Sequence, residues 1–251
     1  MNRFEGRRAL VTGAGSGIGR ATALRLLEEG AAVVAADINE AGLKETAARA
    51  SGGGSLSTAV LDISGEAAVG RVVEEAVSGL GGLDVLVNAA GILRSSHTHA
   101  TTLEFWNTVI GVNLTGTFLV TRSALPALLG TGRGVVVNFS STSASFAHPY
   151  MAAYAASKGG IQSFTHALAL EYSKQGLRAV CVAPGSIQSG MTSDPGLPQD
   201  TDWSLLAKLA PAIGEGFAPP ETVAGVVAML ASDDGAFVTG TEIRVDGGTH
   251  M

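Results

Sequence analysis

The segment RALVTGAGSGIGRATALRLLEEG, residues 8–30, places a glycine-rich turn between two mainly apolar runs. RALVT (8–12) is short and mostly apolar, which predicts a buried strand. IGRATALRLLEEG (18–30) has the length and composition of a helix and ends on Gly30, a residue type common just past a helix C-terminus. A strand that turns through glycines directly into a helix is typical of doubly wound α/β proteins.

The same alternation continues along the chain. Further strands are predicted at 31–37, 55–62, 83–91, 134–141, 178–185 and 241–248, with helical segments between most of them. Continuous apolar strands separated by helices indicate a parallel sheet covered on both faces. We therefore predict one α/β domain over residues 1–251, with a doubly wound parallel sheet of about seven strands and helices on both faces.

One long irregular region, at about 186–220, interrupts this pattern. Loops of this length inside compact domains often cover active sites, so we expect a lid over the substrate. It carries the large apolar side chains of Met191, Trp203, Leu205, Leu206, Leu209 and Phe217, among others. They are equally compatible with one amphipathic helix packed on the body of the protein.

Charge and composition exclude several classes of partner. The 251 residues are 46% hydrophobic and 15% charged, with a net charge of −6 and no Lys- or Arg-rich run. These features disfavour nucleic acid and anionic membranes as partners. The N-terminus lacks a signal-peptide apolar region and no run of 18 apolar residues occurs, so a cytoplasmic location is expected. Cys181, the only cysteine, is expected to pack in the core, and the five scattered histidines predict no metal site.

The turn TGAGSGIG (12–19) predicts a nucleotide-binding loop. It carries four alternating glycines, Gly13, Gly15, Gly17 and Gly19. They leave the backbone bare where a pyrophosphate would rest on the N-terminus of the following helix. The spacing fits T-G-x-x-x-G-x-G and departs from G-x-G-x-x-G, because Ile18 and Arg20 stand where the last glycine would fall. No Gly-Lys-Ser/Thr follows, which excludes a P-loop. The loop also satisfies G-x-G-x-G, a pattern of S-adenosylmethionine-dependent methyltransferases, so by itself it does not name the cofactor.

Two aspartates at predicted strand ends bear on the choice of cofactor. Asp37 could accept hydrogen bonds from an adenosine ribose and would repel a 2′-phosphate, and Asp62 could accept one from the adenine amine. Each could equally cap the helix that follows it. Neither Ser16 nor Ile38 supplies the basic side chain that a 2′-phosphate needs, so NAD is favoured over NADP.

Taken together, these motifs resemble the short-chain dehydrogenase/reductase family, on its NAD-preferring branch, over nearly the whole chain. The matching pieces, in the order of the family, are TGAGSGIG (12–19), Asp62, NAAG (88–91), Asn113, the serine run at 140–145, Tyr154-x-x-x-Lys158, PG (184–185) and VDGG (245–248). The resemblance implies a single-domain Rossmann fold and a homotetramer. Two departures are visible: Ala89 replaces a second asparagine, and Ser189 replaces a threonine that contacts the nicotinamide carboxamide.

The resemblance also implies a set of cofactor contacts. They are Gly13, Ser16, Gly17, Ile18, Gly19, Asp37, Asp62, Ile63, Asn88, Ala89, Gly91, Tyr154, Lys158, Pro184, Gly185, Ile187 and Ser189. The expected cofactor is NAD.

The stretch YMAAYAASK (150–158) holds the predicted catalytic pair. Tyr154 and Lys158 are separated by four residues, so in a helix their side chains meet on one face. A nearby ammonium stabilises a phenolate, and we expect it to lower the Tyr154 pKa from its usual value of about 10. The resemblance implies that Tyr154 exchanges a proton with the substrate oxygen and that Lys158 also binds the nicotinamide ribose. It further implies that Ser141, thirteen residues before Tyr154, binds that oxygen. Asn113 matches the family asparagine that is associated with a helix kink and with a water leading to the lysine.

The expected reaction is hydride transfer between NAD(H) and a small-molecule secondary alcohol or ketone. Candidate substrate contacts are Ser143, His148, Tyr150 and Met191, and Ser140 is expected to point to the other side of its strand. The alternatives are a 3-oxoacyl-type reductase that uses NADPH, a methyltransferase, and a non-catalytic nucleotide-sensing protein. A methyltransferase would leave Ser141, Tyr154 and Lys158 without a task. Nucleotide-sensing proteins of this fold typically lack the tyrosine or the lysine, and both are present here.

Overall fold

The computed structural model describes residues 2–214 and 216–251, and within them seven strands form one parallel sheet. The strands are β1 (Arg8–Thr12), β2 (Ala32–Asp37), β3 (Ser55–Val60), β4 (Val85–Asn88), β5 (Val135–Phe139), β6 (Arg178–Pro184) and β7 (Glu242–Val245). Their order is β3-β2-β1-β4-β5-β6-β7. The order reverses direction between β1 and β4, which opens a crevice at the carboxyl ends of these two strands. The predicted doubly wound sheet of about seven strands is confirmed.

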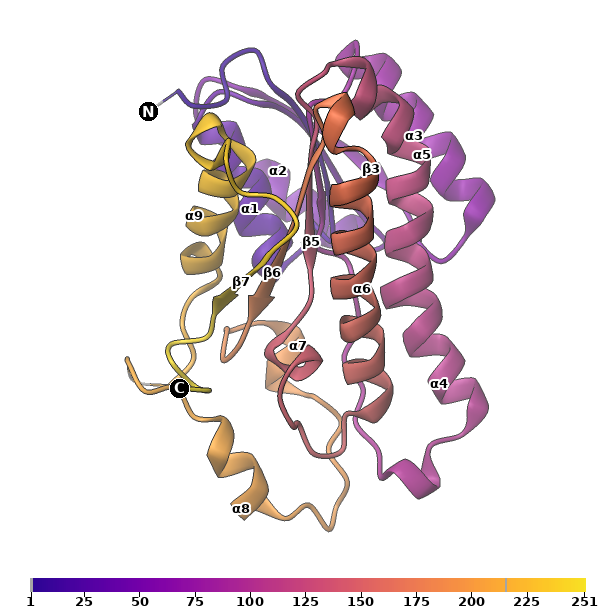
Figure 1. Cartoon of the computed structure of the whole chain (residues 1–251), viewed down its shortest axis with the longest axis vertical. Helices are drawn as coiled ribbons and strands as arrows, with labels where there is room; N and C mark the ends of the chain where they lie inside the picture. Colours follow the sequence, from indigo (N-terminus) through magenta and orange to yellow (C-terminus); the bar gives the residue numbers. More distant parts are fainter. Residues whose placement is uncertain (1, 215) are drawn as a thin grey trace.

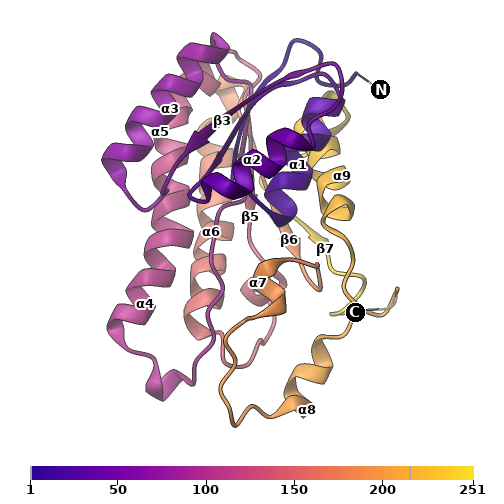
Figure 2. The same cartoon turned by 180° about the vertical axis from the view of Figure 1, so that it is seen from behind.

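Helices cover both faces of the sheet (Figures 1 and 2). One face carries α1 (Gly17–Glu28), α2 (Glu40–Ala48) and α9 (Pro220–Ala231). The other carries α3 (Glu66–Leu80), α5 (Gly116–Gly130) and α6 (Ala152–Glu171). A further helix, α4 (Leu103–Ile110), runs through a π-helical segment, Gly111–Thr115, into α5. Short 3₁₀ turns lie at Thr98–Ala100, Thr142–Ala144, Ser173–Gln175, Ala207–Leu209 and Asp233–Gly235. No helix in the described part of the chain combines the length and the apolarity that crossing a membrane requires.

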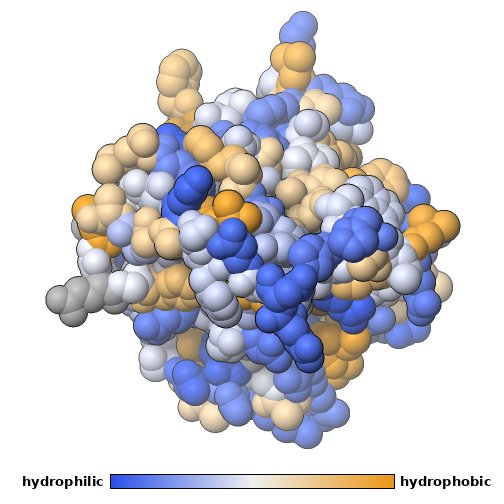
Figure 3. Space-filling model, turned by 90° about the horizontal axis from the view of Figure 1, so that it is seen from below, coloured by the Kyte–Doolittle hydropathy of each residue, from blue (hydrophilic) through white to orange (hydrophobic). Residues whose placement is uncertain are grey.

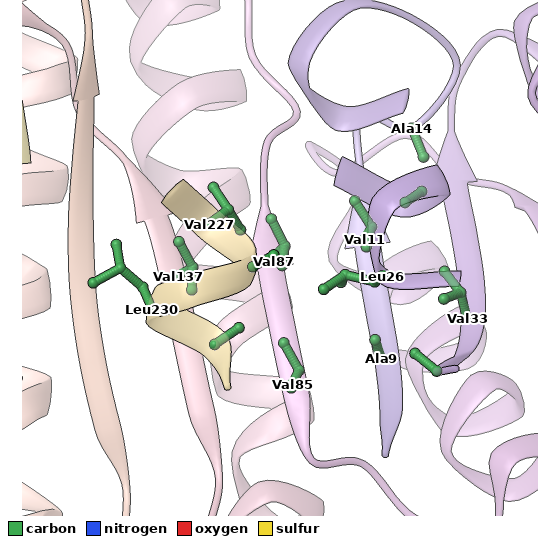
Figure 4. Packing of buried hydrophobic residues seen from close by; sticks show 14 of the residues in the cluster. Ala9, Val11, Ala14, Leu26, Val33, Val85, Val87, Val137, Val227 and Leu230 are labelled. Carbon is green, nitrogen blue, oxygen red and sulfur yellow. The ribbon is translucent and has the colours of Figure 1, made fainter. Parts of the chain in front are cut away.

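The buried strands alternate their side chains between two apolar layers. On one face Val11, Val87 and Val137 pack with Leu26 of α1 and Val227 of α9 (Figure 4). Their sequence neighbours point to the layer that contains α3, α5 and α6. Because both faces are covered, every position of these strands favours an apolar residue, which explains the continuous apolar runs. Burial of each such side chain contributes about 1.5–3 kcal/mol. Cys181 is fully buried in β6, as predicted.

Several predicted strands continue past the ends of the observed ones, and two of these extensions lead to the site. The segment predicted at 83–91 leaves the sheet after Asn88, and the one at 134–141 leaves it after Phe139. The residues that follow, 89–91 and 140–141, turn out of the sheet at its carboxyl edge. These short extensions are the parts of the two segments that reach the site.

The region at 186–220 forms an excursion whose two ends are joined. Gln188 N–H donates to the Ala218 carbonyl at 2.9 Å, and Ala218 N–H donates to the Ser186 carbonyl at 2.9 Å. Between them lie two short helices, α7 (Gly190–Ser193) and α8 (Trp203–Leu206). The alternative of one amphipathic helix is wrong, because Pro195 and Pro198 lack the N–H groups that would carry a helix through this segment.

Candidate active site

The glycine loop packs backbone against backbone at the carboxyl end of β1. A Cβ added to Gly13 would lie 2.6 Å from the backbone nitrogen of Ala90, and one added to Gly19 would lie 2.1 Å from the Gly13 carbonyl oxygen. Gly13 and Gly17 also have positive φ angles of 70° and 51°, which favour glycine. The first turn of α1 carries no acidic side chain, so its N-terminus favours an anion. The loop therefore has no room for side chains at Gly13 and Gly19, and its bare backbone at the start of α1 fits a dinucleotide pyrophosphate.

Asp37 lies against this loop. Its carboxylate accepts hydrogen bonds from Gly15 N–H and Asn39 N–H, both at 2.8 Å. The cap of α2 is Asn39, whose side chain accepts from Gly42 N–H at 3.0 Å. The alternative that Asp37 caps α2 is therefore wrong, and its carboxylate faces the nucleotide end of the site.

Asp62 follows β3 and is exposed. It accepts from the backbone N–H and the hydroxyl of Ser64, at 2.9 and 2.7 Å. The residue that caps α3 is Gly65, so Asp62 holds the turn before the helix instead of capping the helix. Ile63 beside it is buried against Gly116 at the start of α5.

A cavity of about 620 Å³ begins beside the glycine loop. Nine predicted cofactor contacts line it: Ile18, Ala89, Gly91, Tyr154, Lys158, Pro184, Gly185, Ile187 and Ser189. Ser189 also forms a reciprocal cap of α7 with Thr192. A Cβ on Gly17 would lie 3.5 Å from the Ser189 Cβ, so the loop after β6 meets the glycine loop here. Ser16, at the N-terminus of α1, is exposed.

Asn88 is the predicted cofactor contact whose side chain points elsewhere. Its amide nitrogen donates to Thr121 Oγ1 at 2.9 Å and to Asn138 Oδ1 at 2.8 Å. These partners lie in the buried layer under α5 and α6, because Asn88 points to the same face of β4 as Leu86. The side chain of Asn88 therefore stabilises the sheet beneath the site.

Tyr154 and Lys158 project from the first turns of α6 into the cavity, as their spacing predicts. The Lys158 Nζ lies 5.6 Å from the centre of the Tyr154 ring and donates to the Phe139 carbonyl at 2.9 Å. Both side chains are buried, with 7% and 6% of their surfaces exposed. Ser141, two residues after β5, lines the same cavity, while the Ser140 hydroxyl donates to Glu242 of β7 at 2.6 Å.

Burial dominates the protonation of this pair. It raises the pKa of Tyr154 to about 12, opposed by a hydrogen bond with Ser141. It lowers the pKa of Lys158 to about 8. The pKa of Tyr154 is therefore raised, whereas the nearby ammonium was expected to lower it. The phenolate loses its hydration on burial, and this effect is the larger one. At pH 7 Tyr154 is therefore a neutral phenol that holds its proton.

Asn113 connects the catalytic helix to the loop after β4. It is fully buried in the π-helical segment, which is the predicted irregularity of this helix. Its side chain exchanges hydrogen bonds with the Ile92 backbone, at 2.8 and 2.9 Å, and donates to Ser157 Oγ at 3.0 Å. Ser157 in turn donates to the Tyr154 carbonyl at 2.7 Å. Sequence reasoning missed Ser157, although a serine on the buried face of an apolar helix is a signal for such a link.

The predicted substrate contacts divide into two groups. His148 and Met191 line the cavity, and His148 Nε2 lies 3.2 Å from Thr142 Oγ1, a further lining residue that sequence reasoning missed. Ser143 is buried behind Ser141, to whose Oγ its backbone N–H donates at 3.2 Å, so it does not face the cavity as predicted. The serine run turns through a 3₁₀ helix after Ser141, which directs Ser143 into the protein interior.

Tyr150 contacts the lid instead of lining the cavity, which corrects its predicted role. Its hydroxyl oxygen accepts from Asp202 N–H at 2.9 Å. Its ring meets that of His97 edge to face at 5.2 Å, and His97 Nε2 lies 2.9 Å from Asp200 Oδ1. We call the two polar contacts, Tyr150–Asp202 and His97–Asp200, the lid clasp. Leu197 of the lid packs beside Tyr154 in the same region.

Comparison with known proteins identifies this arrangement. A family model described as enoyl-(acyl carrier protein) reductase matches residues 13–250. The crystal structure of a short chain dehydrogenase from Mycobacterium paratuberculosis bound to NAD superposes with a TM-score of 0.90 at 30% identity, covering 98% of each chain. The chain belongs to the short-chain dehydrogenase/reductase family. Short-chain dehydrogenases/reductases are oxidoreductases that bind nicotinamide cofactors, so the protein is an enzyme of this class.

Curated members of the short-chain dehydrogenase/reductase family that resemble this chain differ in their named substrates. A 3-oxoacyl-(acyl-carrier-protein) reductase of Thermotoga maritima is 39% identical over 98% of both chains. A cyclohexanol dehydrogenase of Acinetobacter sp. is 38% identical over 98% of this chain and 96% of its own. Membership in the family therefore leaves the substrate open.

Proposed function

We propose that the protein is an NAD(H)-dependent oxidoreductase that interconverts a secondary alcohol and a ketone. The observation that carries the proposal is the convergence of Ser141, Tyr154 and Lys158 on one cavity beside a glycine loop without room for side chains. A bound nicotinamide dinucleotide supplies the hydride acceptor or donor. Its pyrophosphate would rest on the glycine loop, its ribose beside Lys158, and its carboxamide beside Ser189.

The residues of the chain handle the proton. In ketone reduction the Ser141 hydroxyl donates a hydrogen bond to the substrate oxygen, and the Tyr154 phenol delivers its proton to that oxygen. The high pKa of Tyr154 keeps this proton in place at neutral pH. As this proton leaves, negative charge develops on the phenol oxygen, and Lys158 stabilises it. In alcohol oxidation the phenolate form of Tyr154 accepts the proton of the alcohol hydroxyl, and the phenol is restored. Asn113 and Ser157 hold the first turn of α6, which carries Tyr154, in register with the loop after β4.

NAD is the proposed cofactor because Asp37 stands at the end of β2 with the exposed, uncharged Ile38 beside it. The second candidate function is reduction of 3-oxoacyl groups with NADPH. It is favoured by the similarity to the Thermotoga maritima reductase and opposed by the Asp37 carboxylate, which would repel a 2′-phosphate.

We further propose that the chain forms one domain in which residues 186–220 are the lid over the substrate. We also propose that the protein is a homotetramer in the cytoplasm. Light scattering on the purified chain tests the tetramer.

Removal of the Tyr154 hydroxyl, and of the proton that it carries, tests the catalytic assignment. Tyr154→Phe is expected to lower turnover of secondary alcohols and ketones by about 10³-fold or more, while NADH still binds, because the ring remains and the proton is lost. Turnover is followed by NADH absorbance and cofactor binding by NADH fluorescence. The matched control is Tyr172→Phe at the end of α6, which is expected to retain full turnover. Undiminished turnover by Tyr154→Phe would contradict the mechanism.

A further inference from the structure

The lining of the cavity defines a substrate class, and this inference deepens the proposed function and rests on it. We infer that the reacting part of the substrate is an uncharged and largely hydrocarbon ketone or secondary alcohol. Keto acids, hydroxy acids and phosphorylated sugars fall outside this class. Three properties of the cavity carry the inference: its charge, its one imidazole and the composition of its lid wall.

The cavity offers no counter-charge to an anionic substrate. Among the described residues that line it, Lys158 alone carries a formal charge at neutral pH. The Lys158 ammonium is buried beside Tyr154 and donates to the Phe139 carbonyl. It therefore lies at the catalytic end of the cavity and serves the reacting oxygen. A carboxylate or phosphate elsewhere in the substrate would lose hydration without gaining a partner, which is costly in a desolvated site.

His148 contributes a hydrogen bond and no charge. Its ring is half-buried in the cavity wall, 3.2 Å from Thr142 Oγ1 and 5.6 Å between ring centres from His250. Burial, with a contribution from His250, lowers the His148 pKa to about 4, so the imidazole is neutral at pH 7. A neutral imidazole suits a hydroxyl, carbonyl or ester group of the substrate and does not compensate a carboxylate.

The wall opposite the cofactor contacts is apolar. It is formed by side chains of the lid and of the loops beside it: Leu93, Met151, Leu197, Trp203, Leu206 and Phe217. At this end of the molecule hydrophobic residues reach the surface among hydrophilic ones (Figure 3). Such a wall stabilises hydrocarbon in proportion to the apolar area removed from water. The cavity volume of about 620 Å³ is shared with the nicotinamide end of the cofactor, because predicted cofactor contacts form its other wall.

Two matched pairs of ketones test the inference. Each pair has one carbon skeleton and differs in charge: methyl 4-oxocyclohexanecarboxylate against 4-oxocyclohexanecarboxylate, and methyl 4-oxopentanoate against 4-oxopentanoate. With the 251-residue chain and NADH at pH 7, kcat/KM for each ester is expected to exceed that for its acid by about 100-fold, the order of the penalty for an unpaired buried charge. Equal values of kcat/KM within both pairs overturn the inference and leave the proposed function standing.

A charge placed on the lid wall gives the reverse experiment. Leu206→Lys puts an ammonium into the cavity lining, and it is expected to raise kcat/KM for the acids by about 10-fold or more and to lower it for the esters. Leu205→Lys is the matched control, because Leu205 is the neighbour of Leu206 on α8 but is exposed and lies outside the lining. It is expected to leave both pairs unchanged. An equal gain for the acids in Leu205→Lys and Leu206→Lys would contradict the assignment of the lid wall.

Binding separates failure of the inference from failure of the proposed function. Thermal unfolding is measured with NAD alone, and then with NAD plus each ester or acid. A rise in Tm with NAD and a further rise with the esters only supports the substrate class even where turnover is slow. A further rise with the acids that equals that of the esters overturns the substrate class. Turnover of neither pair, together with no response to NAD, overturns the proposed function and with it the inference.

Discussion

The glycine loop and the lid border the same cavity, yet they are held by opposite kinds of contact. The glycine loop packs main chain on main chain, with Gly19 so close to the Gly13 carbonyl that even one added carbon would overlap it. The lid is held at its tip by the lid clasp, whose carboxylate on Asp200 is 78% exposed. Buried backbone packing does not tolerate even small structural changes. Each exposed side-chain hydrogen bond, in contrast, contributes only about 1 kcal/mol or less to stability, so it can be lost at little cost. We therefore propose that the rigid region binds the cofactor and that the region able to vary selects the substrate.

The largest effect is expected from one carbon added to the glycine loop. Gly19→Ala forces the start of α1 away from Gly13, and NAD affinity is expected to fall by about 100-fold or more, since the pyrophosphate cradle is deformed. Isothermal titration with NAD measures the loss. Gly70→Ala is the matched helical control, because a Cβ there meets nothing within 4 Å. It is expected to keep full affinity and to stabilise the protein by about 0.5–1 kcal/mol. Full NAD affinity in Gly19→Ala would contradict the proposal that the glycine loop tolerates less change than the lid.

Lys158 lines the cavity that both regions border, and its burial should affect the stability of the protein. Its pKa of about 8 in the folded protein lies below the 10.5 of an unperturbed lysine, so the charged amine is disfavoured by folding. The cost is complete below pH 8 and disappears as pH rises from about 8 to 10.5, where the unfolded chain binds the extra proton. Lys158→Met is therefore expected to raise the free energy of unfolding at pH 7 by about 1–3 kcal/mol, with the gain fading toward pH 10.5, while activity is lost.

Urea titrations at pH 7 and pH 10 measure this difference. Lys174→Met, at an exposed lysine beyond α6, is the control and is expected to change stability little at either pH. A Lys158→Met variant that is less stable than the parent protein at pH 7 would show that the ammonium is stabilised by its surroundings.

A smaller effect is expected at the nucleotide end, from one charge. Asp37→Asn keeps an oxygen for Gly15 N–H and removes the repulsion of a 2′-phosphate, so the preference for NAD over NADP is expected to fall by about 10-fold. The ratio of kcat/KM with the two cofactors measures it. Asp62→Asn, at the neighbouring strand end, is expected to leave the ratio unchanged. A parent protein that prefers NADP would overturn the interpretation of Asp37.

The smallest effect is expected from the lid clasp. Tyr150→Phe removes the acceptor for Asp202 N–H, and KM for the ketone is expected to rise by about 2- to 5-fold with NAD affinity unchanged, since one exposed hydrogen bond is lost. Steady-state kinetics and NAD titration give the two numbers. Asp200→Asn is expected to act in the same direction and more weakly. A change in NAD affinity equal to the change in KM would mean that the clasp and the glycine loop form one rigid unit.

The fold could be predicted because its signals are local. The apolar runs at 8–12 and 31–37 and the glycines of 12–19 each consist of neighbouring residues. Such local patterns are enough to predict a parallel sheet with helices between its strands. The spacing of Tyr154 and Lys158 is likewise a property of one helix. Strand ends were less predictable. Residues 89–91 continue the apolar run of β4 in the sequence, yet the chain leaves the sheet after Asn88.

The site contacts that could not be predicted all depend on distant segments. Tyr150 and Tyr154 belong to one short stretch, yet one contacts the lid 52 residues away and the other faces the cavity. The direction of the Tyr154 pKa also escaped prediction, because it follows from burial, which no spacing records. The same holds for Ser157, whose partners lie on another helix and its own first turn.

The amino-acid sequence by itself determined the doubly wound sheet, the glycine loop and the choice of Tyr154 as partner of Lys158, because each depends on neighbours within a few residues. Only the tertiary structure decided that Asp37 faces the glycine loop, that Asn88 supports the sheet, that Tyr150 holds the lid and that Lys158 carries the one formal charge among the described residues of the cavity wall. Those properties arise where segments far apart in the chain meet, and their physical cause is the packing that decides which side chains share a desolvated space.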